Sequence, residues 1–224
     1  MIPKIIHYCW FGGKEKQAEF HKWYKTWQSL LPDYKFMEWS EQNFDINYSN
    51  YSREAYLTHN YAHVSDVCRV YALYEYGGVY LDTDVEVIKS FDDFLSLEAF
   101  LGVEHEFLGT GVMGSAPRQK WLEAFLGYYK NRHFINLWGH TVRTPNTKIL
   151  TKTVLPEISI IDYPTIFPRD YFSGMIWETK EIIKTENTVS VHHFAASWRR
   201  KKTFKQKITS IIDGLYIRYI KKSS

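Results

Sequence analysis

The chain has 224 residues, enough for one sizeable domain with its own core, and 45% of them are apolar. A formal net charge of +3 is too small to indicate a nucleic-acid-binding protein. No apolar run approaches the roughly 18 residues of a membrane span, and the opening residues lack the layout of a signal peptide. Cys9 and Cys68 lie in apolar surroundings and are expected to stay reduced, as in a cytosolic protein.

The first residues of the chain predict a β-α-β unit. Residues 4–10 alternate as in a strand, residues 16–31 form an amphipathic helical pattern, and residues 34–39 predict a second, parallel strand. Trp10 then stands at the carboxyl end of the first strand, where open α/β sheets bind their ligands. It is therefore placed to stack on a base, whereas His7, inside the strand, is expected to be a hydrogen-bonded core residue.

A buried helix is predicted over residues 62–76, because its pattern is apolar on nearly all sides. Gly77 ends it, since glycine readily takes the left-handed conformation found at helix ends. Asp66 and Arg69 lie three residues apart on one helix face. They form either a structural ion pair between helix and sheet or one wall of a polar cleft.

Two carboxylates follow the next apolar strand in the segment Val79-Tyr-Leu-Asp-Thr-Asp84. In an extended strand residues two apart share a face, so Asp82 and Asp84 are expected to project together. A pair of carboxylates suits Mn²⁺ or Mg²⁺, with substrate phosphates completing the coordination shell. An isolated Asp-x-Asp also occurs in turns without a metal, so the prediction of a metal site depends on the buried helix and strand that precede the pair.

The remaining pattern predicts an α/β domain whose mixed sheet is flanked by helices. Between residues 43 and 95 the expected elements are a surface loop at 43–51, a strand at 85–88 and a helical turn at 90–95. Two strands at 100–103 and 108–113 and a helix at 118–131 follow. A loop then a helix are expected over 140–155, and irregular structure near the sheet edge at 163–177. Gly109-Thr-Gly111 lacks the full glycine fingerprint of a phosphate-binding loop. It is interpreted as a strand or bulge that faces a ligand.

A last short strand over residues 188–193 ends in two histidines. An imidazole nitrogen beside two carboxylates is a suitable Mn²⁺ ligand. Because strand neighbours point to opposite faces, only one of His192 and His193 can face such a metal. The alternative is a histidine pair that closes a strand without any ligand role.

Taken together, these motifs resemble glycosyltransferase family 32, which includes the glucosyltransferase domains of large clostridial toxins and bacterial capsule and lipooligosaccharide transferases. The resemblance covers roughly residues 2 to 198 and is carried by Ile2-Pro-Lys-Ile-Ile-His-Tyr-Cys-Trp-Phe-Gly-Gly13, Ser65-Asp66-x-x-Arg69, Gly77-Gly78-Val-Tyr80-Leu-Asp82-x-Asp84 and His193-Phe-Ala-Ala-Ser197-Trp198. It implies a GT-A type nucleotide-sugar-binding fold over residues 1–198.

The resemblance also implies roles for individual residues. It implies catalytic roles for Asp66, Arg69, Asp82 and Asp84, donor contacts by Trp10, Asp66, Arg69, Tyr80, Asp82, Ser197 and Trp198, and a metal held by Asp82, Asp84 and His193. It favours His193 over His192 because the family places a loop ligand a few residues before the Ser-Trp pair. The toxins have an acidic residue at this position, so the pattern is not uniform. Retention of the anomeric configuration is implied as well.

Residues 199–224 have a different composition, with nine Lys and Arg and one Asp. Apolar residues recur there at helical spacing opposite the lysines, which is typical of a basic amphipathic helix on an anionic membrane surface. Docking on its own domain and a dimer contact are the alternatives. A cytoplasmic protein, peripheral on the inner face of the cell membrane, is expected.

The sequence therefore predicts a metal-dependent transferase that moves a hexose from a nucleotide sugar, UDP-linked, to a saccharide or lipid-linked saccharide in capsule or lipopolysaccharide synthesis. The cofactor is expected to be Mn²⁺ or Mg²⁺. A metal-dependent sugar nucleotidyltransferase is one alternative, and a non-catalytic saccharide- or membrane-binding module is another. A nucleic-acid partner is not expected, because the basic tail alternates with aliphatic residues.

Overall fold

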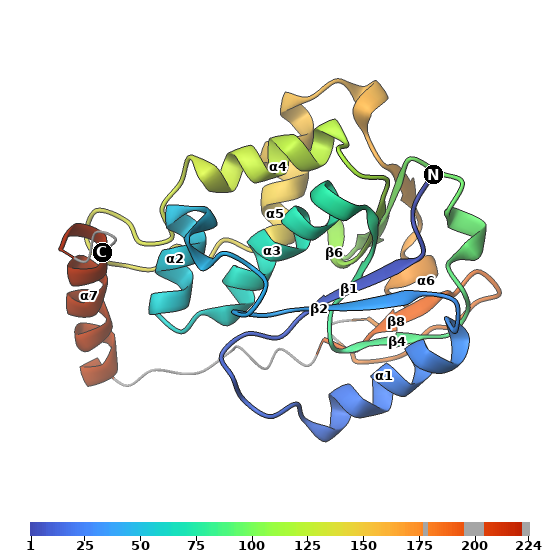
Figure 1. Cartoon of the computed structure of the whole chain (residues 1–224), viewed down its shortest axis with the longest axis horizontal. Helices are drawn as coiled ribbons and strands as arrows, with labels where there is room; N and C mark the ends of the chain where they lie inside the picture. Colours follow the sequence, from blue (N-terminus) through green and yellow to red (C-terminus); the bar gives the residue numbers. More distant parts are fainter. Residues whose placement is uncertain (177–178, 195–203, 221–224) are drawn as a thin grey trace.

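A mixed six-stranded sheet forms the centre of the computed structural model, which describes residues 1–176, 179–194 and 204–220 (Figure 1). Its strands are β1 (Ile5–Cys9), β2 (Lys35–Trp39), β3 (Gly78–Leu81), β5 (Ala99–Glu104), β6 (Phe107–Ser115) and β7 (Thr165–Phe167). They lie in the order β2-β1-β3-β6-β5-β7, and β6 runs antiparallel to both of its neighbours. Strands β4 (Val85–Val87) and β8 (Ser190–His192) pair in a separate two-stranded sheet.

Helices cover both faces of the large sheet, so the predicted fold class is confirmed. They are α1 (Ala18–Leu30), α2 (Asn50–Leu57), α3 (Tyr61–Tyr76), α4 (Lys120–Lys130), α5 (Asn146–Ile149), α6 (Arg169–Phe172) and α7 (Phe204–Tyr219), with short helical turns at Ile46–Tyr48, Asp92–Phe94, Leu150–Val154, Leu155–Glu157 and Ile160–Asp162. Within the described ranges, none of these helices has the length and apolarity to cross a membrane.

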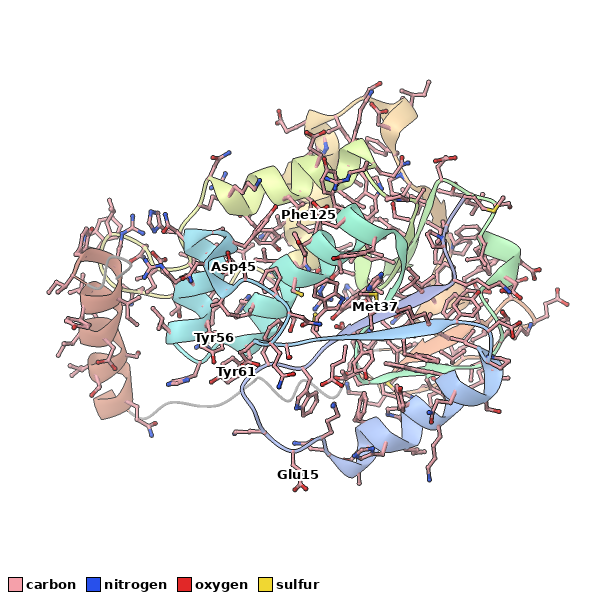
Figure 2. All side chains as sticks on the ribbon, viewed as in Figure 1. Glu15, Met37, Asp45, Tyr56, Tyr61 and Phe125 are labelled. Atoms are coloured by element: carbon pink, nitrogen blue, oxygen red, sulfur yellow. The ribbon has the colours of Figure 1, made fainter. Side chains whose placement is uncertain are left out.

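The two faces of β3 belong to two different hydrophobic clusters. Tyr80 packs with residues of α3 and α4, whereas Val79 and Leu81 pack with residues of α1. This division follows from the alternation of side chains along a strand. Figure 2 shows Phe125 in the layer between α4 and α3, on the first of these faces. The strand that leads to the acidic pair is therefore buried on both sides.

The predicted β-α-β unit is confirmed, with β1 and β2 parallel and α1 between them in sequence. Trp27 of α1 is fully buried, and its indole N–H donates to the Val85 carbonyl at 2.8 Å. A buried indole needs such a partner for its N–H. The contact ties α1 to β4, which begins immediately after the acidic pair.

The predicted buried helix is α3, and its end is also as expected. Its backbone finishes at Gly77, which has φ +63°, and the Gly77 N–H donates to the Leu73 carbonyl at 2.9 Å. A side chain at this position would be strained, because residues with a Cβ rarely adopt positive φ. The turn directs the chain from α3 straight into β3.

Two expected irregular regions contain regular structure instead. Residues 43–51 were predicted as a surface loop, but the chain forms a helical turn and then enters α2. The Ser49 side chain accepts a hydrogen bond from the Ser52 N–H and caps this helix. Residues 163–177 contain β7, which pairs parallel to β5 at the sheet edge, and α6. The cap of α2 is a local contact, whereas the pairing of β7 with β5 is a tertiary contact that local patterns do not report.

His7 is a hydrogen-bonded core residue, as predicted from its place in the first strand. Its Nε2 lies 2.7 Å from the Gly77 carbonyl oxygen, and the Trp39 indole N–H donates to its Nδ1 at 3.0 Å. These contacts fit the neutral imidazole with its proton on Nε2. Burial lowers the pKa of His7 from 6.5 to about 4, and the bond to Gly77 opposes this only in part.

We predict that His7 makes folding pH-dependent. Because its pKa is lower in the folded state, its contribution to stability is complete above pH 6.5 and is lost as the pH falls towards 4. The full loss is about 3 kcal/mol at 1.36 kcal/mol per pKa unit. The free energy of unfolding is measured in urea from pH 7.5 to 4.5 for the wild type and for His7→Asn. The difference between the two proteins is expected to shrink by about 2–3 kcal/mol at the acidic end. A constant difference between the two proteins would contradict this.

Candidate active site

The acidic pair lies in a tight turn between β3 and β4. The strand ends at Leu81, so the extended arrangement predicted from sequence through Asp84 does not form. The Asp82 N–H donates to the Gly111 carbonyl at 2.8 Å, and the Val85 N–H returns to the Asp82 carbonyl at 3.0 Å. This turn, rather than strand pleating, brings Asp82 and Asp84 to the same cluster of side chains.

Arg69 of α3 connects the helix to this turn. Its Nη2 lies 3.2 Å from Asp66 Oδ1 and 3.1 Å from Asp82 Oδ1, and its Nη1 donates to the Thr110 carbonyl at 2.8 Å. The guanidinium also lies over the Tyr80 ring, 4.6 Å from its centroid. The predicted Asp66–Arg69 pair is therefore present, as a buried link between helix and sheet that reaches the acidic pair.

The buried network shifts the pKa values of its members in different directions. Burial raises the pKa of Asp82, and the Arg69 charge compensates only in part. For Asp66 burial acts in the same sense, but Arg69 and His63 outweigh it and lower its pKa. Burial lowers the pKa of Arg69, yet Asp82 and Tyr80 raise it well above its usual value. Arg69 is therefore a permanent cation between a fully ionised Asp66 and a more weakly acidic Asp82.

His192, not His193, faces the acidic pair. Its Nε2 lies 3.2 Å from Asp84 Oδ1 and 3.9 Å from Asp82 Oδ2. The structure places His193, the residue favoured from sequence, away from the acidic pair: its Nε2 lies 3.0 Å from Glu86 Oε2, and its ring stacks on Trp23 at 4.0 Å. The reason is the register of β8, in which His192 pairs with Val85.

The far side of the His192 ring faces Glu104 of β5. The two side chains approach to 3.5 Å between Nδ1 and Oε2. Burial lowers the pKa of His192, but Asp84 and Glu104 outweigh burial and raise it well above its ordinary value. A carboxylate behind a histidine is the arrangement that usually orients the imidazole of a metal ligand.

The other predicted donor-binding residues have different positions. Trp10 follows β1 and is half-buried at the same sheet edge as Asp82, since β1 and β3 are parallel neighbours. Its indole N–H donates to the Lys14 carbonyl at 2.6 Å. Tyr80 is only 1% exposed, and its hydroxyl donates to Asp82 Oδ1 at 3.0 Å, so it orients this carboxylate. Ser197 and Trp198 lie outside the described residues.

Two residues that contact Asp66 were not singled out by the sequence. Asn146 of α5 donates from Nδ2 to Asp66 Oδ1 at 3.0 Å, and His63 Nδ1 lies 3.2 Å from Asp66 Oδ2. His63 has a local signal, because it precedes Asp66 by three residues on the same helix. Asn146 has none, since it is eighty residues away in the chain.

A divalent cation is chemically compatible with Asp82, Asp84 and His192. One ligand atom from each lies within 4.8 Å of the others, and the set combines carboxylate oxygen with imidazole nitrogen. Asp82 already receives hydrogen bonds from Arg69 and Tyr80. Asp84 and His192 are therefore the stronger candidates for direct ligands, with Asp82 beside them.

An acidic pair at the carboxyl end of a strand lies where α/β sheets bind their ligands, and its carboxylates suit a divalent cation that also contacts substrate phosphates. Residues 17–101 match the family described as "Glycosyltransferase sugar-binding region containing DXD motif". An uncharacterized glycosyltransferase of Acanthamoeba polyphaga mimivirus is 31% identical over 194 residues, which cover 77% of this chain and 76% of that protein. The chain belongs to this glycosyltransferase family, as its motifs predicted.

Other relatives are longer proteins. A mannosyl phosphorylinositol ceramide synthase of Saccharomyces cerevisiae is 29% identical over 153 residues, which cover 62% of this chain and 37% of the yeast protein. The chain thus spans about two fifths of the length of such yeast relatives. Among solved structures, a glycosyltransferase involved in glycosylation of the PBCV-1 major capsid is 14% identical with a TM-score of 0.49, covering 86% of this chain and 95% of that one.

The packing of Gly111 yields a stability prediction. A Cβ at Gly111 would lie 2.8 Å from His192 ring atoms and 3.1 Å from Asp82 Oδ2, whereas one at Gly127 in α4 would meet nothing within 4 Å. Gly111→Ala is expected to lose about 1–3 kcal/mol of unfolding free energy through overpacking. The control Gly127→Ala is expected to gain about 0.5–1 kcal/mol, because alanine favours helix. Equal urea midpoints for the two variants would contradict this packing.

Proposed function

We propose that this chain transfers a hexose from a nucleotide sugar to a saccharide acceptor in a metal-dependent reaction. The observation that supports this most strongly is the convergence of Asp82, Asp84 and His192 on one point beside the buried Arg69. Carboxylate and imidazole groups gathered at a sheet edge suit a phosphate-bound cation. Family membership supplies the reaction class.

Different residues of the network would bind the donor and orient it. Arg69 and Asp66 would hold hydroxyl groups of the donor sugar and fix its anomeric carbon against the acceptor. Tyr80 and Arg69 hold the Asp82 carboxylate in place. Trp10, at the same edge, offers an indole face on which the base of the donor would stack. Ser197 and Trp198 are proposed to close over the diphosphate.

Asp84 and His192, with Asp82 beside them, would hold Mn²⁺ or Mg²⁺. When bound, the cation supplies Lewis acidity that neutralises the charge developing on the diphosphate leaving group. No carboxylate in the described cluster is free of the network to serve as a covalent nucleophile. The family resemblance implies retention, and without a covalent nucleophile we propose that retention proceeds by front-face displacement, with the acceptor hydroxyl approaching on the side of the leaving group.

We propose a chemical class for the donor and one for the acceptor. A UDP-hexose donor and a saccharide or lipid-linked saccharide acceptor of capsule or lipopolysaccharide synthesis are proposed from the motif pattern. A second candidate is mannose transfer to an inositol-containing lipid, because the yeast relatives are named for mannosyl phosphorylinositol ceramide synthesis. A lipid-linked saccharide or an inositol-containing lipid would place the acceptor at a membrane, where residues 199–224 would make peripheral contact.

A screen of nucleotide sugars with Mn²⁺, including UDP-hexoses and GDP-mannose, tests the function directly. Release of a nucleoside diphosphate with transfer or hydrolysis of the sugar would support it. Release of pyrophosphate would indicate a nucleotidyltransferase instead. Saccharide binding without Mn²⁺ and without turnover of any donor would indicate a non-catalytic module. The anomer of the product tests retention, which an inverted linkage would refute.

Asp84→Asn is expected to lower metal-dependent donor hydrolysis by at least about a hundredfold, because an amide is a poorer ligand for a hard cation. Hydrolysis of the donor found in the screen is the measurement, with circular dichroism to check that the fold is kept. Full activity in the folded variant would contradict the role of Asp84.

The two histidines form a matched pair for testing the metal site. His192→Ala is expected to weaken Mn²⁺ binding by at least about tenfold, measured from the free Mn²⁺ signal in electron paramagnetic resonance. His193→Ala is expected to retain wild-type affinity, because His193 contacts Glu86 and Trp23 instead. The reverse ranking would restore the original choice of His193 and overturn the site described above.

A further inference from the structure

The loop after α4 exposes two large apolar side chains at its tip. Trp138 is 71% exposed and Leu137 is 60% exposed. Tryptophan is highly buried on average in folded proteins, so its exposure beside leucine is informative. In the described part of the chain, nothing covers these two side chains.

This loop is held in a defined conformation. At its base, the buried Glu54 carboxylate accepts a hydrogen bond from the Ile135 N–H at 2.9 Å. At its tip, the Asn136 side-chain oxygen accepts from the N–H groups of Trp138 and His140, each at 3.0 Å. The Val142 N–H closes the loop by donating to the Phe134 carbonyl at 2.7 Å. The exposed apolar tip is therefore presented by fixed backbone.

Helix α7 docks on the backbone of the same loop, which lies beside it in Figure 1. Tyr219 donates from its hydroxyl to the Leu137 carbonyl at 3.2 Å, and Arg218 donates to the Ile135 carbonyl. Gly214 packs so closely on Gly139 that a side chain there would collide with the Gly139 carbonyl. Because backbone carbonyls make this contact, the side chains of the loop tip stay outside it.

The opposite side of α7 is an exposed apolar stripe. Its helical spacing places on one side the residues Ile208, Ile212, Tyr216 and Ile220, all of them exposed. The side that faces the domain contains the buried Gly214 and Ile217. The helix thus docks on its own domain, one alternative considered from sequence, and still offers a second apolar face.

Charge distinguishes this end of the molecule from the rest. The segments 130–143 and 204–220 together contain six Lys and Arg and one Asp. The rest of the sequence contains 22 basic and 24 acidic residues. A basic, apolar end on a molecule whose remainder is slightly acidic is attracted to an anionic surface in a preferred orientation.

We infer that the loop tip of Leu137 and Trp138 and the outer face of α7 form one docking surface for an anionic lipid membrane. Aliphatic side chains enter the boundary of the acyl chains, while tryptophan and tyrosine rings lie at the headgroup level. The Lys and Arg of both segments meet the lipid phosphates. The surface refines the peripheral contact of the proposed function by adding a loop that is remote from the tail in sequence.

A lipid surface fits this face better than a second copy of the chain. Two copies meeting through it would bring the six basic residues of segments 130–143 and 204–220 of one against the same six of the other. Like charges gathered at a contact oppose association. An anionic membrane neutralises them instead, so charge complementarity selects the occupant.

Co-sedimentation with vesicles tests the surface. The full chain is expected to bind vesicles of phosphatidylcholine with phosphatidylglycerol, and to bind pure phosphatidylcholine far less. The double variant Trp138→Ser with Ile212→Ser is expected to lower the partition coefficient by about tenfold or more, because both side chains lose their burial in lipid. Ile161→Ser is the matched control, since Ile161 is 86% exposed outside both segments.

Quenching by brominated phosphatidylcholine in the same anionic vesicles reports on Trp138 itself. The wild type is expected to lose more tryptophan fluorescence than Trp138→Phe, which keeps an apolar ring at the loop tip. This comparison also serves if the double variant fails to fold. Equal quenching of the two proteins would overturn the proposal.

Three further results would also overturn it. These are a double variant that binds vesicles like the wild type, a wild type that does not sediment with anionic vesicles, and a dimer that the double substitution dissociates without any vesicle binding. Donor hydrolysis in vesicle-free solution is measured in parallel. Vesicle binding without hydrolysis would refute the proposed function alone, and hydrolysis without vesicle binding would refute the docking surface alone.

Discussion

The arrangement of the site depends on one buried guanidinium. Arg69 reaches from α3 to a carboxylate on its own helix, to another in the turn after β3, and to a carbonyl of β6. A buried charge is costly without partners, and a buried pair adds little net stability. Arg69 instead fixes the position of α3, because any shift of this helix against the sheet would leave charged groups unpaired. The helix, the turn and β6 therefore hold one relative position.

Much of this arrangement could be predicted from sequence because its signals are short-range. Asp66 and Arg69 are three residues apart, the helix stops at two glycines, and the carboxylates follow within a few residues. Helical spacing, glycine conformation and strand alternation translate such patterns into geometry. The β-α-β unit and the buried helix were recognised for the same reason.

The rest of the site depends on pairing between distant segments, which these patterns do not encode. The two histidines differ by one position, and a shift of one residue in a strand exchanges its faces. Only the pairing of β8 with β4 decides that His192 turns towards the carboxylates. Asn146 and Glu104 reach the same network from α5 and β5, and neither carries a local signal.

The docking surface shows the same limit in a second region. The tail was recognised because it is basic and periodic, whereas Trp138 belongs to a loop whose sequence resembles any other connection. The position of Trp138 beside the tail becomes apparent only in the structure, where close packing of Gly139 on Gly214 brings the loop against α7. None of the residues in that contact belongs to the network around Arg69. The proposed membrane contact and the proposed sugar-transfer site therefore depend on separate sets of contacts, so a substitution in one set is expected to leave the other intact.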